Sequence, residues 1–379
     1  MKLKNNVFKF YRIVRDKKLF SFGDNIADIR VGDTTLRDHQ DFVIKSLNCE
    51  IIDIGEEDLN SMETGSFYFD ENLFFTLQFL KQAIFTAQDS NVSMKFCLRK
   101  NTFNDRFILP HSNKETEYIE FDLVYVYDWE SDIKNVLIEQ KIYVNFVELP
   151  EQIVRGRRFH MDQCDTFASH IISPFHQLQV NLAINLNRTI RLQKFIPAKW
   201  RSGHGSKWAF RALKRLNKIG KNVKIHPSAI IEGSIIGDNS TIGANSIVRL
   251  STIGKNCSVS ENVSVINSIL GDRTYISNSN YILNCMTYEE VFMIHGPYQF
   301  SIWGKNSACF AVINADIRLD QKTIKIPTDI GVIDSKQPLL GIAYGHDSKI
   351  GGGSIIAAGR IIPNGRIIPP PDNIILKFD

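Results

Sequence analysis

A six-residue repeat of aliphatic residues governs the second half of the chain. From Ile219 to Ile282, apolar residues follow one another at steps of 6, 6 and 5 residues. Ile219, Ile236, Ile253 and Leu270 therefore stand 17 residues apart, and a glycine follows each of them. This period matches neither the 2.0 of a strand nor the 3.6 of a helix. It predicts a coil with three flat sides whose aliphatic residues stack inside a prism.

The repeat defines where the coiled region begins, pauses and ends. It is broken at 287–301 and again at about 320–338, and it resumes at Tyr344 and runs to the prolines 369–371, which cannot continue a strand ladder. We expect a parallel β-helix over 219–379, with these two interruptions as loop excursions from one face. The glycines after the aliphatic residues, with asparagines such as Asn239 and Asn245, suit tight turns or backbone with positive φ.

Length and composition exclude several classes of protein. A chain of 379 residues predicts two domains, and 43% hydrophobic residues are enough for real cores. No apolar run approaches the ~18–20 residues of a membrane span. The net charge of +4 is too small to indicate a nucleic-acid partner, and the six cysteines lack metal-site spacing. We therefore expect a cytoplasmic protein with reduced, mostly buried thiols.

The first 196 residues have no such repeat. Strand-like and helix-like runs alternate there, which predicts an α/β domain with a partly parallel sheet. The strand-like runs are 7–13, 51–54, 93–98, 118–127 and 141–147, and the helix-like runs are 37–47, 73–87, 132–140 and 173–192. Residues 197–218 are basic with interleaved aromatic and aliphatic residues, which predicts a linker helix that caps the open end of the β-helix.

The repeat resembles a known family. Blocks such as IGDNSTIGANSI are similar to the left-handed β-helix of bacterial hexapeptide-repeat transferases and to the C-terminal tails of sugar nucleotidyltransferases. The resemblance implies the left hand of the coil and a homotrimer that packs prism against prism. Acyltransferases, nucleotidyltransferases and scaffolds all carry this repeat, so it does not determine a function.

Three segments of the first domain resemble sugar-1-phosphate nucleotidyltransferases that carry hexapeptide tails. They are Asp28-Ile29-Arg30-Val31-Gly32 with Thr35-Leu36-Arg37, then Phe69-Asp70-Glu71-Asn72-Leu73-Phe74, and finally Ser173-Pro174-Phe175-His176-Gln177-Leu178 with Asn181. The resemblance implies that Arg30, Gly32 and Arg37 bind the phosphates of a nucleotide or sugar phosphate. It implies that Asp70 binds Mg²⁺, which prefers carboxylate oxygen together with substrate phosphate.

One element of that family is absent from the sequence. The glycine-rich loop that holds the triphosphate has no counterpart, because no G-x-G occurs before residue 203. Gly23-Asp24-Asn25 stands where related sequences often place Thr-Arg-Pro. The sequence therefore lacks a phosphate-facing cation at that place.

Two histidines of the β-helix are candidate catalytic residues for a different reaction. Acyl transfer by this fold typically uses a histidine as general base. His346 lies where the repeat resumes, just before Gly351-Gly352-Gly353, and His295 lies in the first interruption.

Three functions remain open from the sequence. The leading hypothesis is Mg-dependent nucleotidyl transfer from a nucleoside triphosphate to a sugar 1-phosphate, with release of pyrophosphate. The alternative is a hexapeptide-repeat acyltransferase with an acyl-CoA donor and a histidine base. The third is a catalytically degenerate protein for binding or assembly.

Overall fold

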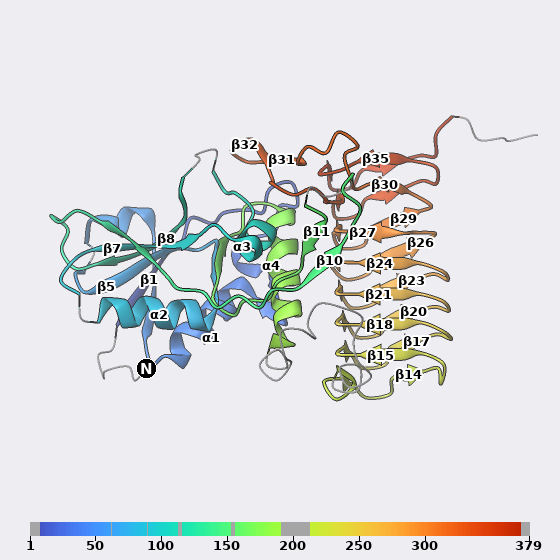
Figure 1. Ribbon diagram of the computed structural model, residues 1–379, viewed down its shortest axis with the longest axis horizontal. Helices are drawn as coiled ribbons and strands as arrows, with labels where there is room; N and C mark the ends of the chain where they lie inside the picture. Colours follow the sequence, from blue (N-terminus) through green and yellow to red (C-terminus); the bar gives the residue numbers. More distant parts are fainter. Residues whose placement is uncertain are drawn as a thin grey trace, which may run out of the picture. The chain divides into compact units, whose positions relative to one another are not determined.

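The structure is a computed structural model that describes residues 8–61, 63–88, 90–112, 116–152, 156–190 and 213–372 (Figure 1). The chain forms two compact units: the first contains Met1–Val144 and Asp162–Val180, and the second contains Asn145–Met161 and Asn181–Asp379. This division corrects the boundary expected at 196, because a segment of the first half belongs to the second unit. Most of the expected linker helix at 197–218 lies outside the described residues.

A six-stranded mixed sheet forms the centre of the first unit, with strand order β4-β1-β5-β8-β7-β9. Strand β1 pairs in parallel with both β4 and β5, β8 is antiparallel to β5 and β7, and β9 is parallel to β7. The bounds are β1 Lys9–Ile13, β4 Glu50–Ile54, β5 Ser66–Asp70, β7 Met94–Arg99, β8 Tyr118–Val126 and β9 Lys134–Leu137. The predicted α/β class is confirmed. The expected helix at 132–140 is instead strand β9, because pairing with β7 overrides a weak local preference.

Three α-helices, the first part of a fourth that continues into the second unit from Asn181, and several short elements complete this unit. The helices are α1 Leu36–Ser46, α2 Leu77–Ala87, α3 Thr102–Phe107 and α4 Pro174–Asn187, and the 3-10 turns are η1 Ile26–Asp28 and η2 Glu56–Ser61. The short strands are β2 Arg30–Val31, β3 Thr34–Thr35, β6 Leu73–Phe75 and β12 Ala168–His170. Thr35 caps α1, since its hydroxyl oxygen accepts the Asp38 backbone N–H at 3.1 Å. The helix expected from Leu73 begins at Leu77, because 73–75 pairs with β12.

Side chains alternate between the two faces of this sheet, which determines where the candidate site lies. On one face Phe10 stacks on Phe67 at 4.5 Å between ring centroids. On the opposite face Tyr11 stacks on Tyr68 at 4.9 Å. Asp70 is two residues after Tyr68 on β5 and so projects from the tyrosine face, at the carboxyl end of the strand.

The second unit is a parallel β-helix. Three sheets take one strand from each coil, in the orders β13-β16-β19-β22-β25-β28-β33-β36, β14-β17-β20-β23-β26-β29-β34-β37 and β15-β18-β21-β24-β27, and a further pair is β30-β35. The strands stack as a ladder that continues up to β30 and β35 (Figure 1). Their bounds are β13 Lys218–Ile219, β14 Lys224–Ile225, β15 Ile230–Glu232, β16 Ile235–Ile236, β17 Thr241–Ile242, β18 Ile247–Arg249, β19 Thr252–Ile253, β20 Ser258–Val259, β21 Ser264–Ile266, β22 Ile269–Leu270, β23 Tyr275–Ile276, β24 Tyr281–Leu283, β25 Met286–Thr287, β26 Phe292–Ile294, β27 Tyr298–Gln299, β28 Ile302–Trp303, β29 Ala308–Phe310, β30 Ile313–Ala315, β33 Ala343–Tyr344, β34 Lys349–Ile350, β35 Ile355–Ala357, β36 Ile361–Ile362 and β37 Ile367–Ile368.

The register of the coil is the one that the repeat predicts. Ile236, Ile242, Ile253 and Val259 are each 1% exposed and belong to one continuous core. Ile253 pairs with Ile236 on one side and Leu270 on the other, so residues 17 apart stack directly. The three parallel stacks, in the same order in each successive coil, are consistent with the expected left-handed β-helix.

The first interruption of the repeat is not a loop excursion. Residues 287–301 continue the coil as β25, β26 and β27, with Ile282 opposite Tyr298 and Met286 opposite Ile302. This coil is one residue shorter than its neighbours, and larger side chains replace the usual aliphatic ones: Met293 and Tyr298 are fully buried in the core. The six-residue repeat does not predict this coil, because both the spacing and the residue types change.

The second interruption does leave the coil. Between β30 and β33 the chain forms an antiparallel hairpin of β31 Lys325–Thr328 and β32 Gly331–Asp334. A second hairpin, of β10 Phe146–Glu148 and β11 Arg158–His160, also belongs to this unit. The two are linked by a hydrogen bond from Gln321 Nε2 to the Gln152 carbonyl at 3.1 Å.

Glycine and asparagine have different roles at the corners of the coil. Asn239 and Asn245 have φ of 60° and 57°, in the left-handed region, as expected. Gly237 and Gly254 are not among the glycines with positive φ. A Cβ atom on Gly237 would lie 2.5 Å from the Gly254 carbonyl oxygen of the next coil. These glycines are therefore needed for the close approach of successive coils, which corrects the expectation of positive φ.

Two further expectations concern the environment of the chain. All six cysteines are buried and free of disulfides, as expected for reduced thiols. Among the helices of the described segments, none is both long and apolar enough to cross a membrane.

Candidate functional site

The strand order of the first unit places a topological switch point between β1 and β5. The chain leaves β1, forms β4 on one side of it, and returns to form β5 on the other side, so β1 lies between its two parallel partners. In open α/β sheets ligands bind at such a switch point, outside the carboxyl ends of the strands. Ile13 pairs with Asp70, which brings the loop after β1 to the end of β5.

Asp70 is the central acidic residue at this switch point. Its side chain is 7% exposed, and its Oδ2 atom contacts Arg15 Nη1 at 2.5 Å and Lys17 Nζ at 2.7 Å. Its Oδ1 atom is buried and has no hydrogen-bond partner among the described residues. A buried carboxylate oxygen normally has a partner, because an unsatisfied buried polar atom costs free energy. Oδ1 is therefore an oxygen that a bound ligand or ion can satisfy.

The loop after β1 supplies both cations. The Arg15 side chain also pairs with Glu56, and although burial opposes its charge, Glu56 and Asp70 raise the pKa of Arg15. The backbone amides of Arg15 and Lys17 both donate to Glu71 Oε1, each at 2.9 Å. The side chains of Arg15 and Lys17 are 30% and 37% exposed, so both can be reached from solvent.

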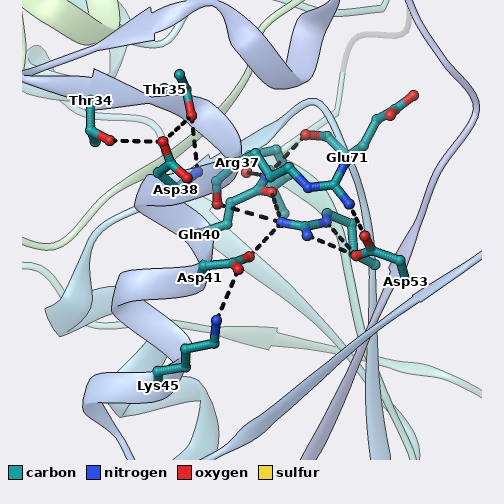
Figure 2. A network of polar contacts seen from close by, with 11 residues as sticks. Thr34, Thr35, Arg37, Asp38, Gln40, Asp41, Lys45, Asp53 and Glu71 are labelled. Carbon is teal, nitrogen blue, oxygen red and sulfur yellow. Dashed lines mark hydrogen bonds and ion pairs between the residues drawn. The ribbon is translucent and has the colours of Figure 1, made fainter.

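The substrate-binding residues implied by the resemblance have contacts of their own in this unit. Arg30 is the first residue of β2 and Gly32 lies in the turn between β2 and β3, and Arg30 Nε donates to the Gly32 carbonyl at 3.1 Å. Arg37 lies in the first turn of α1 and pairs with Asp53 of β4. Figure 2 shows this network, in which Arg37, Gln40 and Asp41 come from α1 and Asp53 from β4. The hydrogen-bond and ion-pair partners of Asp70 are Arg15 and Lys17, and not these residues.

Hydrogen bonds and ion pairs connect this network to the turn after Asp70. Arg12, 4% exposed, pairs with Asp41 and Asp53 and donates to Gln40 Oε1 at 3.0 Å. Gln40 in turn donates to the Glu71 carbonyl at 2.9 Å. The chain of contacts fixes the backbone of the turn that follows Asp70.

The two cations of the β1 loop could have been predicted from the sequence. Arg15-Asp16-Lys17-Lys18 is a basic run directly after the first predicted strand. The loop after the first parallel strand is where α/β folds place phosphate contacts. The expectation of a missing cation considered only the stretch near Gly23, eight residues after Arg15.

A buried histidine borders the site. His170 Nε2 accepts the Asp122 backbone N–H at 3.1 Å, so its Nδ1 carries the proton that it shares with Asn72 Oδ1 at 3.0 Å. Burial is the main cause of a His170 pKa well below its ordinary value, and the nearby charge of Lys17 lowers it further. His170 is thus a neutral residue that ties the turn after Asp70 to strand β8.

His346 has a structural contact in the β-helix. Its Nδ1 atom accepts the Lys305 backbone N–H at 2.8 Å. Asp272 Oδ1 accepts the Lys255 backbone N–H in the same manner, also at 2.8 Å. Since a backbone amide can only donate, the Nδ1 lone pair of His346 is engaged and the ring proton lies on Nε2. A general base needs a free lone pair, so this geometry favours a corner-capping role over catalysis.

His295 lies at a corner of the short coil. It is exposed and has φ of 56°. It follows β26, whose Ile294 carbonyl accepts the hydroxyl of Tyr298 at 3.2 Å. The structure thus places the two candidate histidines at two different corners of the coil.

A divalent cation can bind at Asp70 only together with a ligand that supplies most of its coordinating oxygens. Within the described part of the chain, no group of three or more His, Cys, Asp or Glu residues is arranged to hold a metal ion. Mg²⁺ commonly uses only one or two carboxylates and takes its remaining ligands from substrate phosphates and water. Asp70 Oδ1 can supply one such oxygen, so Mg²⁺ fits here as a complex with a phosphorylated ligand.

The fold defines the chain as a hexapeptide-repeat β-helix protein with an α/β unit before the repeat. Residues 213–291 match the family described as the GMPPB C-terminal domain, which is a domain of a sugar-nucleotidyltransferase family. No curated protein sequence matches the chain.

Several solved structures are similar to parts of the chain. One is PerB from Caulobacter crescentus, in complex with CoA and GDP-perosamine: identity is 14%, 41% of this chain and 51% of PerB are covered, and the TM-score is 0.18. The UDP-N-acetylglucosamine acyltransferase from Campylobacter jejuni is 14% identical over 39% of this chain and 65% of that enzyme, with a TM-score of 0.21. A hexapeptide transferase family protein from Anaplasma phagocytophilum is 16% identical over 41% and 76%, with a TM-score of 0.20.

Proposed function

We propose that the chain is a nucleotidyltransferase-like protein of sugar-nucleotide metabolism that binds a nucleotide or sugar phosphate at the carboxyl ends of β1 and β5. The observation that carries the proposal is the convergence of Arg15 and Lys17 on Asp70, whose buried Oδ1 has no partner within the described segments of the chain. Two solvent-accessible cations suit phosphate oxygens, and the free carboxylate oxygen suits the Mg²⁺ that accompanies them. The family match of residues 213–291 supports the same class.

The proposed reaction is attack of a sugar 1-phosphate oxygen on the α-phosphorus of a nucleoside triphosphate, with pyrophosphate as the leaving group. Arg15 and Lys17 would bind the phosphates and stabilise the negative charge that develops on them. Mg²⁺ bound with the triphosphate would supply further charge stabilisation when present. Asp70 would orient both cations and the metal.

Adjacent lysines of the β1 loop provide a matched test of the site. Lys17→Met should weaken binding of a Mg-nucleoside triphosphate by about tenfold, because one charge-assisted hydrogen bond is lost. Lys18→Met, which removes the neighbouring exposed charge, should change affinity less than threefold. Calorimetric titration of the full chain gives the affinities, and a coupled assay detects pyrophosphate when sugar 1-phosphates are added.

Two outcomes would contradict this proposal. One is the absence of binding to any nucleoside triphosphate or sugar 1-phosphate at millimolar concentration. The other is an equal loss in Lys17→Met and Lys18→Met, which would indicate nonspecific attraction to a basic loop. Binding without pyrophosphate release would support the proposed binding site and contradict the proposed reaction.

A homotrimer is the second part of the proposal. Tyr275, Phe292 and Phe310 form an outward ladder on successive coils, with ring centroids 5.0 and 5.8 Å apart, and each is more than a third exposed. Contiguous exposed apolar surface of this kind is typical of protein interfaces. We expect light scattering to give about three times the chain mass of 43.2 kDa.

The ladder can be tested directly. Phe292→Arg should shift the assembly to one chain mass, because a charge in the centre of the ladder would be buried without a partner. Val332→Arg changes an exposed aliphatic residue of the β31–β32 hairpin and should leave the mass unchanged. A single chain mass for the unmodified protein at micromolar concentration would refute the assembly.

A further inference from the structure

The loop after β1 has the geometry of an anion-binding nest. Two backbone amides separated by one residue, those of Arg15 and Lys17, point at the same oxygen atom. The intervening residue, Asp16, has φ of 51°, in the left-handed region. Backbone that places successive N–H groups on one side in this way forms a concave site for anions, such as phosphate oxygens.

A side chain of the protein itself fills this nest. Glu71 is 3% exposed, and its Oε1 atom accepts both amides at 2.9 Å. Its backbone is held on two sides, since its N–H donates to the Ile13 carbonyl at 3.2 Å and its carbonyl accepts from Gln40. The carboxylate is thus delivered to the nest by a rigid turn.

The formal charges of the site show why this matters for a phosphorylated ligand. Arg15 and Lys17 are positive, whereas Glu56, Asp70 and Glu71 are negative, and all five are joined by the contacts described above. The carboxylates already outnumber the cations. A phosphate group that entered without any other change would add like charge to a partly buried site.

We propose that Glu71 is an internal, displaceable ligand of the β1 nest, so that the phosphate site of the unliganded chain is occupied by the protein's own carboxylate. This inference rests on the proposed phosphate binding at the same site. A phosphate group of the ligand takes the two amides when Glu71 withdraws, and a divalent cation at Asp70 Oδ1 offsets the added charge. Glu71 therefore selects for ligands that bring both a phosphate group and a metal ion.

Amide hydrogen exchange of the full chain tests the nest without any ligand. In Glu71→Gln the two amides lose a charged acceptor, so a peptide covering residues 14–18 should exchange at least about threefold faster than in the unmodified chain. Glu56→Gln removes an equal charge from the other partner of Arg15 and touches no backbone amide. It should leave this peptide unchanged. Equal exchange in the two variants would overturn the proposal.

Pyrophosphate with Mg²⁺ tests the displacement. We expect calorimetry to show at least about tenfold tighter binding to Glu71→Gln than to Glu56→Gln, with slower exchange of residues 14–18 on binding. Tighter binding without that slowing would contradict the nest. If Glu71→Gln fails to fold, Glu71→Asp withdraws the carboxylate by one methylene and gives the same comparison. If no nucleotide binds, but residues 14–18 exchange faster in Glu71→Gln than in Glu56→Gln, the proposed function is contradicted. The assignment of Glu71 to the nest is still supported.

Discussion

Ile242→Asp should prevent the β-helix from folding. Ile242 is 1% exposed and stacks between Ile225 and Val259 of the neighbouring coils. The substitution removes a buried side chain worth about 1.5–3 kcal/mol and places a carboxylate where no partner is available. Because each coil is stabilised by its neighbours, a coil that does not fold also removes the strand pairing and packing surface of the next coil. Typical domain stabilities of about 5–15 kcal/mol cannot absorb both costs.

The neighbouring residue is a matched control for this prediction. Thr241 belongs to the same strand but is exposed, and its partner Lys224 on the preceding coil is exposed as well. Thr241→Asp should give soluble protein with unchanged circular dichroism, whereas Ile242→Asp should be insoluble. Ile242→Ala should fold and lose about 2–5 kcal/mol in urea unfolding. Native-like solubility of Ile242→Asp would show that the inward register is wrong.

The β-helix could be predicted from the sequence because its order is local. Every 17 residues the same inward and corner positions return, so Ile236, Ile253 and Leu270 identified the register without any knowledge of distant contacts. The prediction failed where that regularity was lost. In the coil of Met293 and Tyr298, side chains of a different size fill the same core, and only the packed structure shows that they are equivalent.

The candidate site could be predicted only in part. Asp70 was identified because the segment Phe69–Phe74 resembles the strand-end acidic turn of sugar-1-phosphate nucleotidyltransferases. Its partners depend on which strands lie side by side, and the pairing of β1 with β5 is a non-local fact. Arg15 and Lys17 are 55 and 53 residues from Asp70 in the sequence. The role of Glu71 depends on backbone amides, which carry no sequence signature at all.

Acid should destabilise the first unit well before its carboxylates are protonated. Four of its histidines are held neutral: burial is the main cause that lowers the pKa of His39, His111, His170 and His176, the last to about 3. In the unfolded chain a histidine titrates near its ordinary pKa of about 6.5. Below that pH the unfolded chain binds more protons than the folded one, so the free energy of unfolding falls as the pH falls.

Each histidine of this kind lowers the free energy of unfolding by about 1.4 kcal/mol for every pH unit between its unfolded and its folded pKa. The stabilisation is fully present above pH 6.5 and is lost progressively toward the folded pKa. Between pH 6.5 and pH 5, His176 alone should therefore remove about 2 kcal/mol. His170 acts in the same direction, because its pKa in the folded chain is also well below the unfolded value.

Urea unfolding at pH 7.5, 6.5 and 5, followed by hydrogen exchange, resolves the two units. Peptides from β8 and α2 report the first unit, and they should become exposed at lower urea as the pH falls below 6.5. His176→Gln loses the pair of hydrogen bonds to Ser173 and the Pro110 carbonyl, so it is less stable at pH 7.5. It should nevertheless show a shallower pH dependence, since one proton-linked group is gone. His226→Gln changes an exposed histidine of the β-helix and should leave the slope of the first unit unaltered. A pH dependence that His176→Gln leaves unchanged would show that His176 does not contribute to it.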